Sequence, residues 1–258
     1  IATEQAIKIL NEISIPISDR QVLKNIAVTA MTGKVAEGNK ELLAGLVVEA
    51  VDRVAVGKTI SLEDVKTEKI IGESAAESEL VEGIVLNKER VHKEMPSVIE
   101  SARILLIDFA LEIRNPETQT RIQISTPEQL DAFVESEERY LRDFADKIVA
   151  AGANVVFCQK GIDDVAQYYL AKEGIFACRR VNKSDMEKLA RATGGKIISN
   201  LNDISREELG IAGKVEEITR ADESLIYIRG CSNPRAVTLI VKGSSEHVAS
   251  EIERAVKD

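Results

Sequence analysis

Residues 152–175 read GANVVFCQKGIDDVAQYYLAKEGI, and this stretch contains the unit on which the predicted fold is built. The apolar run VVF at 155–157 is typical of a buried strand. Gly161 interrupts the run, and after Asp163 the apolar residues recur at helical spacing, so one face of a helix packs inward. The IFACRRV segment at 175–181 then predicts a second strand. The stretch therefore predicts a strand–helix–strand unit.

A long, highly charged helix is predicted before this unit, at 127–151. Thr126 is suited to cap it, Pro127 suits its first position, and Glu128 lies in its first turn. Its apolar residues recur three and four apart: Leu130, Phe133, Val134, Leu141, Phe144 and Ile148. This stripe is typical of an amphipathic helix that packs on a core. If the outer half projects from its domain, some of these residues, and Tyr140, would instead be exposed.

The rest of the chain alternates between strand and helix patterns, which indicates an α/β fold. The most apolar run, at 103–113, predicts a central strand, and the alternating RIQIS at 121–125 predicts an edge strand. Further strands are expected at 81–86, 196–201, 224–231 and 236–243, and helices at 1–15, 41–54, 184–193 and 246–258.

Composition excludes several classes of function. A net charge of −9 argues against nucleic acid or an anionic membrane as the main partner. Aromatic residues make up 3% of the chain and Trp is absent, which leaves little surface on which bases could stack. No apolar run reaches the ~18 residues that a membrane span needs. The chain begins at Ile1 and ends in a helical pattern, so we expect a fragment of a longer protein.

Catalytic and metal-binding motifs are not found. The three cysteines have no CxxC spacing, and they are interpreted as buried apolar residues in a reducing compartment. His92 and His247 are isolated, so no metal site is expected. The adjacent Asp163 and Asp164 are explained by their position at a helix start, where carboxylates are favourable, rather than as an acid–base pair.

Two long strings carry a resemblance to a known family. VVFCQKGIDDVAQYYLAKEGI, followed by RRVNKSDMEKLARATG, resembles the apical domain of the group II chaperonins, which include the archaeal thermosome and its eukaryotic cytosolic relatives. The resemblance extends over nearly the whole chain. It implies an apical domain, a β-sandwich flanked by helices, inserted in a small α/β intermediate domain. The expected bounds are 1–66 and 222–258 for the intermediate domain and 67–221 for the apical domain, with a helical protrusion at about 125–151.

The resemblance also implies a function. Such a subunit would be an ATP-dependent folding chaperone of the cytoplasm. Its double ring, of identical or different subunits, would bind unfolded proteins and enclose them under a built-in lid. ATP and Mg²⁺ would be bound mainly by an equatorial domain without counterpart in this chain, so we expect the fragment alone to be inactive as an ATP hydrolase. The alternative is a passive protein-binding module without nucleotide coupling.

Two groups of residues gain expected roles from the resemblance. In the loop Thr32-Gly33-Lys34, Lys34 would sense the terminal phosphate of the nucleotide. A P-loop is rejected there, because Val28 occupies the position of its first glycine. The family usually has a glycine where this chain has Val35. Asp258 would be the catalytic carboxylate that orients the attacking water.

Client proteins are expected to bind the helix at 162–172 and the neighbouring protrusion. Gln167, Tyr168 and Lys172 are expected to point away from the packed face of that helix. The residues expected to bind clients are Leu130, Phe133, Val134, Tyr140, Gln167, Tyr168 and Lys172.

Overall fold

The computed structural model describes residues 2–14, 19–55, 64–112, 126–220, 223–231 and 236–258. Within these ranges the side chains of Leu130, Asp131, Val134 and Arg220 are not described. Contacts divide the chain into two compact units. Unit 1 comprises 1–52, 69–79 and 241–258, and unit 2 comprises 53–68 and 80–240.

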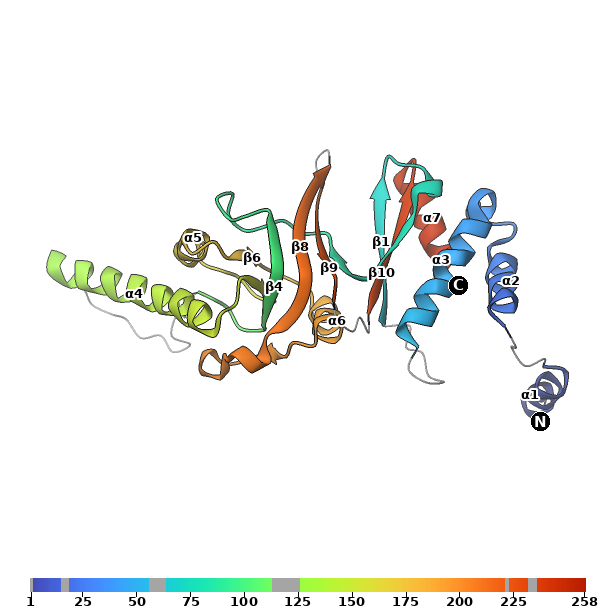
Figure 1. The fold of residues 1–258 in the computed structure, drawn as a ribbon, viewed down its shortest axis with the longest axis horizontal. Helices are drawn as coiled ribbons and strands as arrows, with labels where there is room; N and C mark the ends of the chain where they lie inside the picture. The colour runs from blue at the N-terminus through green and yellow to red at the C-terminus, as the bar shows by residue number, and fades with distance from the viewer. Residues whose placement is uncertain (1, 15–18, 56–63, 113–125, 221–222, 232–235) are drawn as a thin grey trace. The chain divides into compact units, whose positions relative to one another are not determined.

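Unit 1 is built mainly from helices of the two ends of the chain (Figure 1). A three-stranded sheet has the strand order β1-β10-β2. The elements are α1 (Ala2–Ile13), α2 (Arg20–Met31), η1 (Val35–Asn39), α3 (Lys40–Val54), β1 (Val65–Ile71), η3 (Ala75–Glu77), β2 (Glu79–Val81), β10 (Val237–Gly243) and α7 (Glu246–Lys257). Asp19 and Ser245 cap α2 and α7, accepting hydrogen bonds from the backbone N–H groups of Val22 and Val248, as their sequence positions predict.

Unit 2 contains a mixed sheet of seven strands in the order β3-β9-β8-β4-β5-β6, with β7 paired to β4. β3, β9, β8 and β4 pair antiparallel, whereas β4, β5, β6 and β7 pair in parallel. The strands are β3 (Gly83–Leu86), β4 (Val98–Ile107), β5 (Val155–Cys158), β6 (Phe176–Cys178), β7 (Ile197–Ile198), β8 (Gly210–Arg220) and β9 (Glu223–Arg229). Its helices are α4 (Pro127–Ala151), α5 (Asp164–Lys172), α6 (Lys183–Thr193), η4 (Leu201–Asp203) and η5 (Arg206–Glu208).

Both faces of this sheet are covered. On one face, Phe157 and Leu106 pack with Met186 and Leu189 of α6. On the other, Leu105 and Val156 pack with residues of α4 and α5, among them Leu141, Phe144, Ile148 and Leu170. The central strands are apolar on both sides because a strand between two helical layers has no solvent face. The predicted α/β class and the predicted strand–helix–strand unit at β5, α5 and β6 are confirmed.

Three expectations differ from the structure. The chain was expected to leave the apical part near residue 222, but β9 pairs with β8 and β3 in the sheet of unit 2, so the boundary by contacts falls between Ile240 and Val241. Around the first expected boundary the chain passes between the units more than once, because residues 53–68 belong by contacts to unit 2 and residues 69–79 to unit 1. The helix expected at 184–193 begins one residue earlier, at Lys183, after the extended Asn182. The edge strand expected at 121–125 lies outside the described residues.

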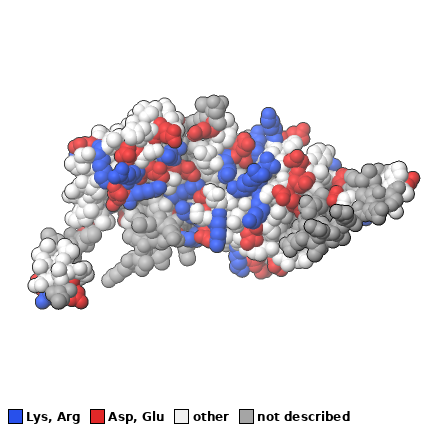
Figure 2. Space-filling view, turned by 180° about the vertical axis from the view of Figure 1, so that it is seen from behind, with Lys and Arg blue, Asp and Glu red and all other residues white. Residues whose placement is uncertain are grey.

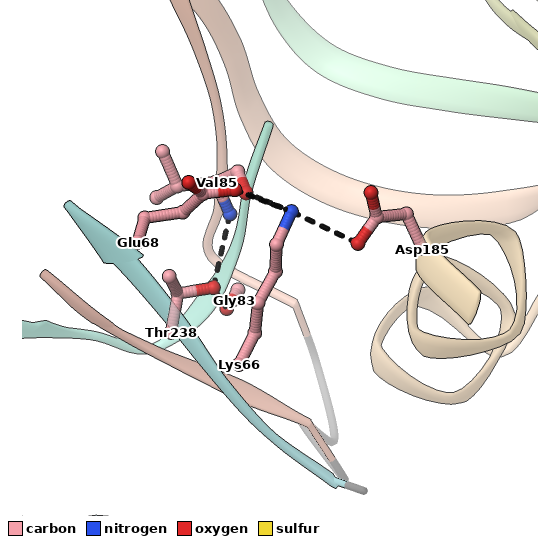
Figure 3. A network of polar contacts seen from close by, with 6 residues as sticks. All are labelled: Lys66, Glu68, Gly83, Val85, Asp185 and Thr238. Carbon is pink, nitrogen blue, oxygen red and sulfur yellow. Dashed lines mark hydrogen bonds and ion pairs between the residues drawn. The ribbon is translucent and has the colours of Figure 1, made fainter. Parts of the chain in front are cut away.

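A buried lysine at the start of β1 forms ion pairs and a hydrogen bond with other residues of unit 2. Lys66 is 7% exposed, and Figure 3 shows its ammonium group between Glu68, Asp185 and the carbonyl oxygen of Val85. The Lys66 Nζ atom lies 2.8 Å from Glu68 Oε1, 2.9 Å from Asp185 Oδ1 and 2.8 Å from Val85 O. Each of the three N–H donors of the Lys66 ammonium group thus has an acceptor. These contacts replace the hydrogen bonds to water that the group loses on burial. The contact joins β1 to the first turn of α6.

Candidate functional site

The Thr32-Gly33-Lys34 loop is a tight turn between α2 and η1. Thr32 ends α2 and donates its hydroxyl to the carbonyl oxygen of Val28. Gly33 has a φ of +76°, a backbone conformation that favours glycine. Its N–H donates to a side-chain oxygen of Glu37, 3.2 Å away. This turn fixes the backbone from which the Lys34 side chain projects, and Lys34 itself is only half-buried.

The structure brings two separately predicted residues of unit 1 together. Lys34 Nζ lies 2.7 Å from Oδ2 of Asp258, although the two residues are 224 positions apart in the chain. Asp258 follows the last turn of α7, and α7 packs against η1, which begins directly after Lys34. The family resemblance implied a role for each residue without indicating that they form a pair. The result is a surface ion pair with both side chains partly open to solvent.

The ion pair changes the acidity of Asp258. The hydrogen bond from Lys34, and then its positive charge, hold the pKa of the Asp258 carboxyl below its usual value near 3.8. A carboxyl group whose pKa is lowered on folding stabilises the fold above its unfolded pKa, and this contribution is lost as the pH falls through the lowered, folded pKa. Because the Asp258 side chain is half exposed, water and salt screen the effect.

Replacing Lys34 by glutamine should raise the Asp258 pKa back towards its ordinary value. Glutamine can still donate a hydrogen bond but carries no charge, so part of the downward shift should remain. The measurement is a titration of the Asp258 carboxyl carbon by NMR. Lys40→Gln is the control, because Lys40 pairs with Glu37 and not with Asp258. An unchanged Asp258 pKa in Lys34→Gln would show that the pair does not form in solution.

The second predicted site lies on α4 and α5 in unit 2. Tyr140, Tyr168 and Lys172 are exposed, and Phe133 is half-buried. Leu130 and Val134 lie in α4, but their side chains are outside the description. The prediction for Gln167 is wrong: it is 4% exposed, and its amide donates to the carbonyl oxygen of Ile162 and to Asp164 Oδ1. Polar acceptors in the first turn of α5 and just before it let this amide turn inward.

The two halves of α4 have different surroundings. From Pro127 to Tyr140 none of the described side chains is buried, whereas Leu141, Phe144, Ala145 and Ile148 pack on the sheet of unit 2. Figure 1 shows the outer half extending beyond that sheet. At 1.5 Å per residue, the exposed half is roughly 20 Å long. Among the described residues of the apolar stripe, those that are fully buried in the core all lie in the second half of α4.

Sequence reasoning missed the residues that join α4 to α5. The hydroxyl of Tyr169 donates to Glu138 Oε1 at 2.6 Å, and this bond is the main reason that the pKa of Tyr169 is raised. Tyr140 packs edge-on against Phe144, with ring centroids 4.9 Å apart. Val165 is exposed beside Tyr168 on the same helix. Helical spacing was the available signal for Tyr169, but its partner Glu138 lies across the interface between the two helices.

Other chemistry finds no support in the described part of the chain. Burial raises the pKa of Cys158 and Cys178 to about 12 and that of Cys231 to about 11, so these thiols are unreactive, as the sequence predicts. No cluster of three or more metal-ligating side chains occurs among the described residues. Asp163 caps α5 by accepting the N–H of Val165, which confirms its structural interpretation.

Two general surface properties complete this description. The described helices include none that is long and apolar enough to cross a membrane. On the face drawn in Figure 2, Lys and Arg side chains lie among Asp and Glu side chains. The described part of that face thus carries side chains of both signs of charge.

Comparisons with known proteins agree over the whole chain. The family model of the TCP-1/cpn60 chaperonin family matches residues 1–258. Thermosome subunit beta of Archaeoglobus fulgidus is 54% identical and that of Thermococcus kodakarensis 52% identical, each over 100% of this chain and 48% of the relative's length. An open-state monomer of a group II chaperonin from Methanococcoides burtonii superimposes with a TM-score of 0.78 at 40% identity, covering 100% of this chain and 60% of that one. The chain therefore spans about half the length of the curated relatives it matches.

Proposed function

This chain belongs to the TCP-1/cpn60 chaperonin family, and from that premise we propose that it is the intermediate and apical part of an ATP-dependent folding chaperone. Unit 1 corresponds to the intermediate part and unit 2 to the apical part. The full subunit would assemble with others into a double ring in the cytoplasm and bind unfolded proteins. The observation that carries the proposal is the match to thermosome subunits across the entire chain, at about half identity.

Nucleotide coupling is proposed for the Lys34–Asp258 pair. Lys34 is a compact, partly exposed cation on a glycine turn, which suits contact with a terminal phosphate. Asp258 is a carboxylate held ionised by that same lysine, which suits it to orient a water molecule. ATP and Mg²⁺ supply the phosphoryl group and its charge neutralisation when bound. Asp258 and the terminal phosphate then compete as anionic partners of Lys34.

The pair fits such a group only as a part of the site. One cation and one carboxylate do not hold a nucleotide, and the described residues contain no further group that could hold the metal. The remaining ligands would come from the half of the relatives' length that this chain does not match. For this reason we expect the 258-residue chain to hydrolyse no ATP by itself.

Client binding is proposed for α4 and α5. Tyr140 of α4 and Val165 and Tyr168 of α5 are large apolar or aromatic side chains that remain exposed on two helices packed against each other. Such surfaces mark sites of interaction with other proteins. The outer half of α4 would serve as the protrusion that closes over a client, because its described side chains have no core to pack against. Gln167 is not included in this surface.

The test measures light scattering from a denatured, aggregating protein in the presence of this chain, with and without ATP. We expect suppression that does not change with ATP, and less suppression by Tyr168→Ala, which removes an exposed ring without a core contact. Phosphate release, measured alongside, should stay at background. Suppression equal in wild type and Tyr168→Ala would contradict the proposed surface, and ATP-dependent suppression would contradict the assignment of nucleotide binding to other residues.

A further inference from the structure

A groove of about 600 Å³ lies between α4 and α5 in unit 2. Its surface is mainly apolar, with Leu141 at its base and Val165 and Tyr168 along the α5 side. Tyr168 is 50% exposed, so its ring is available to a second molecule. A surface of this size can hold a few side chains of an extended or helical segment.

Carboxylates form the polar part of the same groove. They come from both helices: Glu137, Glu138, Asp163 and Asp164. Among the described residues, none of these four carboxylates lies in an ion pair with Lys, Arg or His. Three of them accept hydrogen bonds, Glu138 from Tyr169, Asp163 from the Val165 N–H and Asp164 from Gln167. The groove therefore combines exposed apolar surface with carboxylates that have no cationic partner among the described residues.

The nearby cations of α4 are paired elsewhere. Arg139 pairs with Glu135 at 3.2 Å, and Arg142 lies 4.0 Å from Asp146. The two members of each pair lie one helical turn apart on α4, and neither arginine lines the groove, although the positive charge of Arg142 reaches Tyr169, which does. The hydrogen bond from Tyr169 to Glu138 joins the two sides, so the groove is formed before a partner arrives.

We propose that this groove selects client segments in which Lys or Arg stands beside apolar side chains. The apolar surface takes the apolar side chains, and the carboxylates take the cations through charge-assisted hydrogen bonds. The exposed ring of Tyr168 adds a face for cation–π contact. Acidic segments of equal hydrophobicity are rejected by repulsion from the same four carboxylates. This inference rests on the proposed client binding and names the class of client segment that it prefers.

The test compares two fluorescein-labelled peptides with identical Leu and Phe positions, one with Lys and the other with Glu at every polar position. Fluorescence anisotropy measures their binding to the 258-residue chain. We expect the Lys peptide to bind about tenfold more tightly, because several exposed charge pairs add up. The difference should shrink in ~1 M salt, where the screening length falls to about 3 Å.

A matched pair of variants locates the effect. Glu137→Gln removes one groove carboxylate, and should weaken binding of the Lys peptide about 2- to 5-fold while leaving the Glu peptide unchanged or slightly tighter. Glu135→Gln removes the same charge from the same helix, outside the groove, and should change neither. Circular dichroism of both variants checks that α4 remains folded.

The outcomes separate the two proposals. If neither peptide binds the wild-type chain, client binding at this surface fails. If both bind equally well, client binding stands and the preference for cationic segments is overturned. If Glu135→Gln and Glu137→Gln weaken binding of the Lys peptide equally, net charge rather than the groove is responsible, and the assignment to the groove is overturned.

Discussion

Replacing Phe157 by alanine should lower the free energy of unfolding of unit 2 by about 3–5 kcal/mol. Phe157 lies in the middle of β5, fully buried, and its ring packs beside that of Phe176 with centroids 6.4 Å apart. Its neighbours belong to strands on both sides and to α6, so they cannot close the space that the ring leaves. The lowered free energy of unfolding combines the loss of apolar contacts with the cost of the cavity that remains.

Urea unfolding followed by far-UV circular dichroism measures this effect. Phe157→Leu should cost clearly less than the alanine variant, since it keeps most of the buried volume. Tyr168→Ala is the aromatic control: the ring is half exposed, so its loss should change stability by about 1 kcal/mol or less. A cost below about 1 kcal/mol for Phe157→Ala would mean that β5 is not central to the core of unit 2.

Phe157 also illustrates what local sequence predicts well. An apolar run bounded by Gly152 and Gly161 predicts a buried strand because few other structures satisfy three adjacent apolar residues. The Thr126 cap and the left-handed Gly152 at the end of α4 depend only on nearest neighbours, so the length of that helix follows from the sequence. The sequence pattern therefore predicts the α/β layers of unit 2.

Local sequence patterns do not predict contacts between segments that are far apart in the sequence. The Lys34–Asp258 pair joins residues 224 positions apart, and no spacing rule predicts such a pair. The family resemblance named both residues but did not place them together. Gln167 was misjudged for a related reason: a glutamine at helical spacing is ordinarily exposed, unless acceptors such as the Ile162 carbonyl lie within reach. Burial of polar side chains depends on partners that periodicity does not show.

Lys66 is a further case, and its removal carries the second large effect. Lys66→Met should destabilise unit 2 by about 3 kcal/mol, near the lower end of the range for breaking a buried ion pair. Methionine fills the space but leaves Glu68 and Asp185 facing each other without a cation. The cost stays near the lower end because these carboxylates keep 18% and 14% of their side-chain surface exposed.

Two comparisons in urea unfolding distinguish loss of charge from loss of packing. Lys183→Met removes a lysine at the start of α6 that is exposed and paired within its own helix, and should change stability by about 0.5 kcal/mol or less. Adding Asp185→Asn to Lys66→Met should recover part of the loss, because it removes one of the two stranded carboxylates. If Lys66→Met unfolds as wild type does, the carboxylates are solvated without the lysine. The first turn of α6 is then not fastened to β1 by charge.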